Sequence, residues 1–236
     1  MELAKSSYIQ KGTGKDLVFF HGYLASKESF AAQIEYFSEF FKVTAIDFPG
    51  FGNAEPLTEP FSVSDYAVWT KEALGELGVR KPHVIAHSFG CRVAVKLAAG
   101  DAELFDKILL TGPAGIILKR GWKYRVKVKT YRLVKKFAPA FAERKFGSEE
   151  YRRLSPVMRE SYKKIVNEDL RLDAGKVQNE TLIVEGSEDT TTTAAEAKVY
   201  LSHLPHGKLQ GIRGGHFAFA ENPVEFNLTA EEFFYG

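Results

Sequence analysis

The sequence predicts an α/β protein with a mostly parallel, doubly wound sheet that carries an inserted helical segment. Short apolar runs alternate with amphipathic segments from residue 7 to about residue 111, and again from residue 181 onward. Such alternation is typical of βαβ units, in which helices cross over between parallel strands. From residue 116 to 176 the alternation stops, and the pattern becomes helical and strongly basic. We therefore predict a core of residues 1–115 and 177–236 and an inserted helical cap of residues 116–176.

Composition places the chain among ordinary globular proteins. Of its 236 residues 44% are apolar and 26% are charged, and the formal net charge is only +2, so we expect no nucleic-acid partner. No apolar run reaches the length of a membrane span, and the first residues lack the apolar core of a signal peptide. The single cysteine, Cys91, excludes an intramolecular disulfide and fits a reducing compartment. These features predict a cytoplasmic protein without stable membrane insertion.

Each predicted strand is a short apolar run that ends at a turn or at polar residues. The predicted strands cover residues 7–10, 17–20, 42–46, 84–86, 106–111, 181–185 and 208–212. The predicted helices have apolar residues three and four positions apart, and they cover residues 28–40, 62–77, 92–99, 193–201 and a last segment that ends near 234. Ser62 is a favourable first residue for its helix, with Asp65 in the first turn and Gly78 just beyond the last residue.

The segment Ala86-His87-Ser88-Phe89-Gly90 joins a predicted strand to a predicted helix. It nearly matches the G-x-S-x-G nucleophile elbow, in which small residues let the strand and the helix approach closely and the serine side chain projects from a sharp turn. The departure is Ala86, where the pattern has glycine. The helix that follows points its amide groups and the positive end of its dipole toward this turn. The motif therefore makes Ser88 a candidate nucleophile.

Two further strand-end loops supply the partners that a serine nucleophile needs. A hydroxyl requires a base such as histidine, and the imidazole requires a carboxylate that orients it and stabilises its cation. His216 follows the last predicted strand in a glycine-flanked loop, and Asp189 follows the strand before it. In open α/β sheets these loops meet at one edge, where ligands bind. We predict Ser88, Asp189 and His216 as catalytic residues, with Glu188 as the alternative acid.

The chain resembles the α/β-hydrolase-fold superfamily, in the form of a compact serine hydrolase with a helical cap inserted after the sixth strand. The resemblance rests on five motifs that occur in the family's order: His21-Gly22-Tyr23, Asp47-Phe48-Pro49-Gly50-Phe51-Gly52, Ala86-His87-Ser88-Phe89-Gly90, Gly186-Ser187-Glu188-Asp189 and Gly215-His216-Phe217. It implies a Ser-His-Asp catalytic triad and an oxyanion hole formed by the backbone amides of Tyr23 and Phe89.

Four further residues are candidates for substrate binding. His21 precedes the predicted oxyanion loop, and His87 is the variable residue of the elbow. Arg92, four residues after the serine, either binds a substrate carboxylate or pairs within the core, and Trp122 lies in the predicted cap. Residues 119–153 contain 13 lysines and arginines against three glutamates, a local balance of +10. This charge either forms a solvated face or attracts an anionic substrate or an acidic membrane surface.

Three classes of function follow from these residues. The first is a serine hydrolase, specifically a carboxylesterase that acts on small esters. The second is a C–C bond hydrolase or a lyase that uses the same triad on a carboxylated substrate. The third is a non-catalytic binding protein of the same fold. We expect a small-molecule substrate and neither a cofactor nor a metal ion, and the sequence carries no signal for an oligomeric state.

Overall fold

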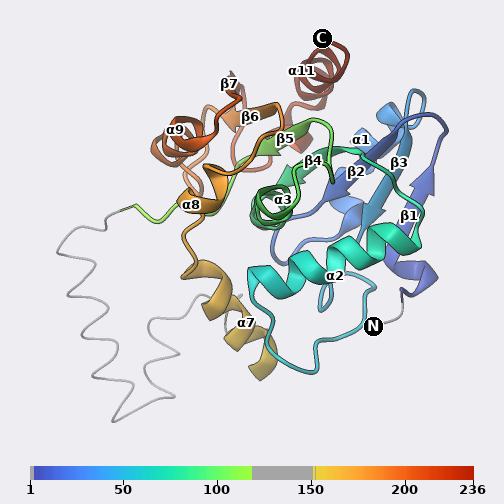
Figure 1. Ribbon diagram of the computed structural model, residues 1–236, viewed down its shortest axis with the longest axis vertical. Coiled ribbons are helices and arrows are strands. Elements are labelled where there is room, and N and C mark those ends of the chain that lie inside the picture. The colour runs from blue at the N-terminus through green and yellow to red at the C-terminus, as the bar shows by residue number, and fades with distance from the viewer. Residues whose placement is uncertain (1–2, 119–150, 152) are drawn as a thin grey trace.

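Seven strands of the described chain form one sheet, in the order β1-β3-β2-β4-β5-β6-β7. The computed structural model describes residues 3–118, 151 and 153–236 (Figure 1). The strands are β1 (Tyr8–Lys11), β2 (Asp16–Phe20), β3 (Lys42–Ile46), β4 (His83–His87), β5 (Ile108–Thr111), β6 (Thr181–Gly186) and β7 (Gly207–Ile212). Only β1 pairs antiparallel, with β3, and every other pair is parallel.

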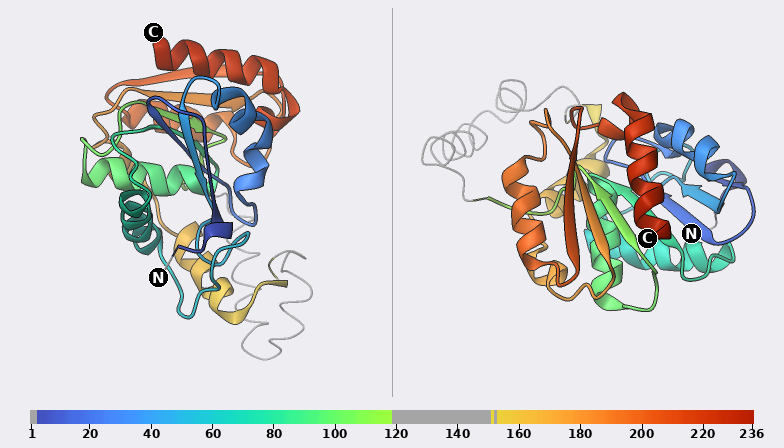
Figure 2. Two further views of the ribbon diagram at one scale, coloured as in Figure 1. Left: turned by 90° about the vertical axis from the view of Figure 1, so that its right-hand side faces the viewer. Right: turned by 90° about the horizontal axis from the view of Figure 1, so that it is seen from above.

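Helices cover both faces of this sheet, which confirms the predicted fold class (Figure 2). The helices of the described residues are η1 (Lys5–Ser7), η2 (Lys27–Phe30), α1 (Ala31–Phe37), α2 (Val63–Glu76), α3 (Phe89–Gly100), α7 (Pro156–Val166), α8 (Arg171–Ala174), α9 (Ala194–His203), α10 (Ala218–Glu221) and α11 (Pro223–Tyr235). Because side chains alternate along a strand, Val18 and Phe20 of β2 face α2 and α3, whereas Leu17 and Phe19 face α1 and α11.

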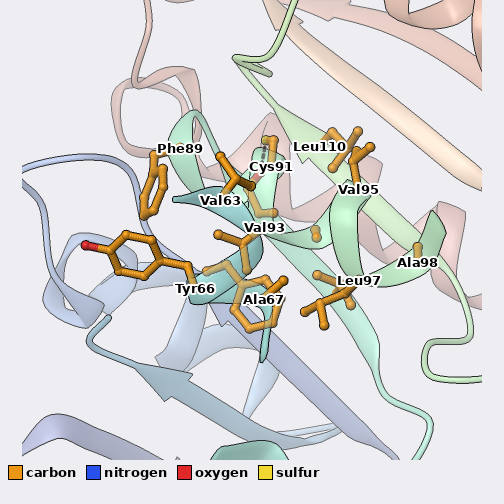
Figure 3. Close-up of a cluster of buried hydrophobic side chains, with 14 of the residues drawn as sticks. Val63, Tyr66, Ala67, Phe89, Cys91, Val93, Val95, Leu97, Ala98 and Leu110 are labelled. Carbon is orange, nitrogen blue, oxygen red and sulfur yellow. Dashed lines mark hydrogen bonds between the residues drawn. The ribbon is translucent and has the colours of Figure 1, made fainter. Parts of the chain in front are cut away.

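The core between α2, α3 and the sheet is continuous apolar packing (Figure 3). α3 packs against α2, where Val93 of α3 lies near Ala67, and Val95 of α3 lies near Leu110 of β5. The Cys91 thiol lies in the same cluster and donates to the carbonyl oxygen of Ala86 at 3.1 Å. Burial raises the pKa of this thiol, so Cys91 is a packing residue without the thiolate character of a nucleophile.

Local sequence accounts for where α2 begins and ends. Ser62 accepts a hydrogen bond from the backbone of Asp65, whose carboxylate in turn accepts from the backbone of Ser62, and Gly78 follows α2 with a φ of +67°. The helix predicted at 28–40 is shorter than expected: it consists of a 3₁₀ turn followed by α1, which ends at Phe37. Its last turn is lost because the chain must turn back to enter β3 at Lys42.

The predicted insertion follows β5. Four strands precede β5, so the insertion comes after the fifth strand of this chain rather than after the sixth. Of this region the structure describes residues 116–118, 151 and 153–176. α8 packs against α3 and α9, with Leu170 and Ala174 fully buried. Trp122 and most of the basic segment lie outside the described residues, so the cap boundaries and the role of that charge stay predictions.

A buried ion pair stabilises the loop after β3. The Asp47 carboxylate is fully buried and accepts three hydrogen bonds: from the Lys27 backbone at 2.7 Å, from the Lys27 ammonium at 2.8 Å and from the Asn53 backbone at 2.8 Å. The Cβ of any side chain at Gly52 would lie 2.3 Å from this carboxylate carbon, so the turn requires glycine. Asp47 therefore holds the 47–53 turn against η2, as a structural residue.

Replacing Asp47 by alanine is expected to lower the free energy of unfolding by about 3 kcal/mol, because it leaves the buried Lys27 ammonium with Glu28 as its remaining carboxylate partner. Denaturant unfolding measures this change. The matched control is Glu103→Ala, which breaks the solvent-exposed pair with Lys81 and should change little. Equal losses in the two variants would contradict a structural role of the buried pair.

Three buried histidines make the stability of the fold depend on pH. Burial is the main cause that lowers the pKa of His21 to about 4, of His83 to about 4 and of His87 to about 3. A histidine in the unfolded chain titrates near 6.5, so between about pH 6.5 and 4 the unfolded chain binds protons that the folded protein does not. This contribution to stability is complete above pH 6.5 and is lost as the pH falls.

Replacing His83 by phenylalanine should therefore reduce the pH dependence. His83 stacks on Phe234 with a centroid distance of 4.6 Å, so a phenylalanine ring fits the same space. Each buried neutral histidine contributes up to about 1.4 kcal/mol per pH unit to the slope of the unfolding free energy below pH 6.5. Urea unfolding at pH 7, 6 and 5 should show a shallower slope for this variant, and an unchanged slope for the exposed control His206→Gln. Identical slopes for wild type and His83→Phe would contradict the assignment.

Among the described helices, none combines the length and the apolar character that a membrane span requires.

Candidate active site

The turn between β4 and α3 holds Ser88 in a strained backbone conformation. Its φ of 50° and ψ of −105° lie in a region that residues other than glycine seldom occupy. The strain is maintained by tight packing on the far side of the turn, where a Cβ at Gly90 would lie 2.2 Å from the carbonyl oxygen of Phe20. The elbow accommodates Ala86 in place of glycine, fully buried in β4 between β2 and β5. The sharp turn places the Ser88 side chain at the carboxyl edge of the sheet.

The structure brings the three predicted catalytic residues together as one hydrogen-bonded chain. The Nε2 atom of His216 lies 3.1 Å from the Oγ atom of Ser88, and its Nδ1 atom lies 2.8 Å from the Oδ2 atom of Asp189. An ionised carboxylate only accepts, so this contact places the imidazole proton on Nδ1 and leaves Nε2 able to accept the Ser88 proton. These are the distances that transfer of a proton from serine to histidine requires.

Asp189 accepts three hydrogen bonds from the residues that follow it and a fourth from His216. Its Oδ1 atom accepts from the backbone of Thr191 at 2.7 Å and of Thr192 at 3.0 Å, and its Oδ2 atom accepts from the Thr192 hydroxyl at 2.8 Å as well as from His216. Burial by itself would raise the pKa of Asp189, but the hydrogen bonds from His216 and Thr192 outweigh it and lower the pKa. The carboxylate is therefore ionised and fixed in place.

Asp189, rather than Glu188, reaches the histidine. Glu188 is exposed, and its backbone N–H donates to Gly214 at 2.8 Å, which ties the two strand-end loops together. Thr192 was not among the predicted site residues, and its hydroxyl lies 2.8 Å from Asp189 and 3.2 Å from the Nδ1 atom of His216. The run of four threonines after Asp189 is the signal that could have identified a hydroxyl or an amide donor there.

The loop after β2 lies directly beside the elbow. A Cβ at Gly22 would lie 2.8 Å from the His87 ring and 3.5 Å from the Cβ of Ser88, so glycine lets this backbone approach the serine. Within the described part of the chain, the backbone N–H groups of Tyr23 and Phe89 donate no hydrogen bond. Both residues line the cavity above Ser88. These two amides are therefore available to a ligand.

His21 and His87 have structural contacts. His21 is buried, with its Nδ1 atom 2.7 Å from the carbonyl oxygen of Gly22, and its Nε2 atom accepts from the Phe48 backbone at 3.0 Å. It does not line the cavity, so the structure does not place it where a substrate could bind. His87 is also buried, and its Nε2 atom lies 3.0 Å from the backbone oxygen of His216. This contact supports the loop that carries His216, and His87, unlike His21, also lines the cavity above Ser88.

A cavity of about 680 Å³ opens above Ser88 and His216. This volume is in the range of small-molecule sites. Its wall is formed by the loop after β2, the start of α3, the end of α7 and residues that follow β5, β6 and β7, and it includes Arg92, Glu196 and Phe217. In the described ranges, no three His, Cys, Asp or Glu side chains are grouped as metal ligands would be. The cavity therefore offers a serine, a histidine, the cation of Arg92 and the carboxylate of Glu196 to a small molecule.

Comparison with known proteins identifies the family. A family model described as the alpha/beta hydrolase fold matches residues 16–172. The chain belongs to the α/β-hydrolase-fold family. Among solved structures, the enol-lactonase of Burkholderia xenovorans resembles this α/β-hydrolase-fold chain with a TM-score of 0.76 and 19% identity, over 97% of this chain and 96% of the other.

Two curated relatives of this α/β-hydrolase-fold chain differ in how much of their length is matched. An (E)-2-((N-methylformamido)methylene)succinate hydrolase of Acinetobacter baylyi is 28% identical over 101 residues, which are 43% of this chain and only 38% of that protein. A pimeloyl-[acyl-carrier protein] methyl ester esterase of Nitrosomonas europaea is 24% identical over 91% of this chain and 94% of that protein. The first is named as a hydrolase and the second as an esterase, and the second matches along nearly its whole length.

Proposed function

We propose that this protein is a serine hydrolase, a carboxylesterase that acts on small esters. The observation that carries the proposal is the hydrogen-bonded chain from Ser88 through His216 to Asp189 at the base of the cavity. Membership in the α/β-hydrolase-fold family and the match to a methyl ester esterase along both chains support it.

The first half of the proposed reaction acylates Ser88. Its Oγ atom attacks the ester carbonyl carbon while the proton moves to the Nε2 atom of His216, and Asp189 stabilises the resulting imidazolium. The carbonyl oxygen becomes an oxyanion, which the backbone N–H groups of Tyr23 and Phe89 bind as an oxyanion hole. The intermediate collapses when the carbon–oxygen bond to the alcohol breaks, and His216 returns the proton to the departing alcohol.

The second half releases the acid. A water molecule takes the place of the alcohol and gives its proton to His216 as its oxygen attacks the acyl carbon. The bond to Ser88 then breaks, and the serine oxygen recovers the proton from His216. The fixed orientation of Asp189 matters in both halves, because His216 must accept and return a proton at the same nitrogen.

A second candidate is hydrolysis or lyase cleavage of a C–C bond in a carboxylated substrate by the same triad. The specific observation that favours it is Arg92, a cation in the cavity wall, because a carboxylate on the substrate would find its counterion there.

Hydrolysis of p-nitrophenyl acetate, butyrate and octanoate tests the esterase proposal. We expect release of p-nitrophenolate with kcat/KM highest for the two short esters, because the cavity is of small-molecule size. Wild-type protein that cleaves none of the three faster than the Ser88→Ala variant would contradict the proposal. Preference for a carboxylated C–C substrate over every ester would favour the second candidate.

A further inference from the structure

Arg92 is a buried cation in the wall of the cavity above Ser88. Its side chain is 7% exposed, and it lies four residues after the serine, on the same face of α3. Its Nη1 atom donates to the carbonyl oxygens of Ile165 at 2.8 Å and of Glu168 at 2.9 Å. These bonds attach the end of α7 to the core and use only one of the three guanidinium nitrogens.

The charge of Arg92 is only partly balanced. The end of a helix carries about half an elementary negative charge, so α7 offsets part of the guanidinium charge. The carboxylates nearest to it have other partners, since Glu168 pairs with Lys96 at 2.8 Å and Asp169 with Arg171 at 2.6 Å. Within the described residues no carboxylate forms an ion pair with Arg92, and burial lowers the pKa of its guanidinium. Burial of a cation whose charge is only partly balanced costs free energy, and a bound anion would offset that cost.

The free part of the guanidinium suits a carboxylate. The Nε and Nη2 groups of Arg92 donate no hydrogen bond within the described part of the chain. A planar guanidinium binds a carboxylate through two parallel hydrogen bonds, which a backbone carbonyl cannot offer. Four residues along a helix correspond to a rise of about 6 Å, so the anion would lie about one helical turn from the carbon that Ser88 attacks.

We propose that Arg92 binds a carboxylate of the substrate, so that the preferred substrates are half-esters of short dicarboxylic acids. This inference rests on the proposed esterase function. It explains why a cation is buried beside the nucleophile without an acidic partner, and it makes Arg92 a residue that determines specificity.

The test compares monomethyl glutarate with methyl glutaramate, in which a neutral amide of nearly the same shape replaces the carboxylate. Hydrolysis of both is followed by proton release in a pH-stat. Wild-type protein should prefer the half-ester at least tenfold in kcat/KM. Arg92→Gln should lower that preference at least tenfold, mainly by raising KM for the half-ester. Arg92→Lys should retain an intermediate preference, because it keeps the positive charge but loses the planar group that donates two parallel hydrogen bonds. The control Lys71→Gln, which removes a cation from the exposed face of α2, should keep the wild-type ratio.

The outcomes separate the two proposals. Equal kcat/KM for half-ester and amide in wild type, or an unchanged ratio in Arg92→Gln, would overturn the carboxylate site. The esterase function would remain in place, and the role of Arg92 would be to anchor α7. Failure of wild type to hydrolyse either compound or the p-nitrophenyl esters would overturn the esterase function itself. If Arg92→Gln does not fold, as judged by circular dichroism, the wild-type ratio and the Arg92→Lys variant decide: ratios near one in both overturn the site.

Discussion

Replacing Ser88 by alanine is expected to lower kcat/KM for p-nitrophenyl butyrate by about 10⁴- to 10⁶-fold, because it removes the atom that bonds to the acyl group. The fold should persist. The Ser88 side chain contacts His216 and does not cap α3, and alanine keeps the Cβ that the strained turn already accommodates. Initial rates and thermal unfolding of the same preparation measure both effects.

Ser187→Ala is the matched control for this substitution. Ser187 is an exposed serine in the loop after β6, two residues before Asp189. Its removal should leave the rate within about twofold of wild type. Activity of Ser88→Ala above a few per cent of wild type, with the unfolding transition unchanged, would rule out Ser88 as the nucleophile.

Replacing Asp189 by asparagine should reduce kcat by about 10³- to 10⁴-fold with little change in folding. The amide oxygen can still accept from the backbone N–H groups of Thr191 and Thr192, so the amide NH₂ group turns toward His216. It then donates to Nδ1, which moves the imidazole proton to Nε2. In that tautomer His216 cannot accept the proton of Ser88.

Glu188→Gln distinguishes the two candidate acids. It makes the same chemical change at the adjacent residue, where the carboxylate is exposed. We expect wild-type kcat for this variant. A large loss at Glu188 together with a small one at Asp189 would show that the acid was assigned to the wrong residue.

The sequence predicted the sheet and both of its helical layers because apolar periodicity reports directly on burial. The strand at Lys42–Ile46 and the helix after Ser62 lie within a residue or two of their predicted bounds, since a buried run and a capping box are local signals. The helix at 28–40 was too long in the prediction. Its apolar spacing continues to Phe41, but that residue packs from the loop that precedes β3, where periodicity cannot tell a loop from a helix.

Prediction of the site depended on whether a residue's position follows from local sequence or from contacts between distant segments. Ser88, His216 and Asp189 stand at strand ends with glycine or other small residues beside them, so topology alone brings them to one edge of the sheet. The contacts of His21 with the Phe48 backbone and of Arg92 with the end of α7 join segments far apart in the sequence. Such pairings are set by three-dimensional packing and leave no local pattern, which is why the sequence left both residues as open candidates.

Covalent labelling with a fluorophosphonate, followed by peptide mapping, tests whether Ser88 is an activated nucleophile. The reagent forms an oxygen–phosphorus bond with an activated serine and releases fluoride, so it reports nucleophilicity without any assumption about the natural substrate. We expect one adduct, on the peptide that contains Ser88, formed at least 100-fold more slowly in His216→Ala than in wild type. Folded wild-type protein that remains unlabelled, or that carries the adduct on another residue, would show that Ser88 is not the nucleophile.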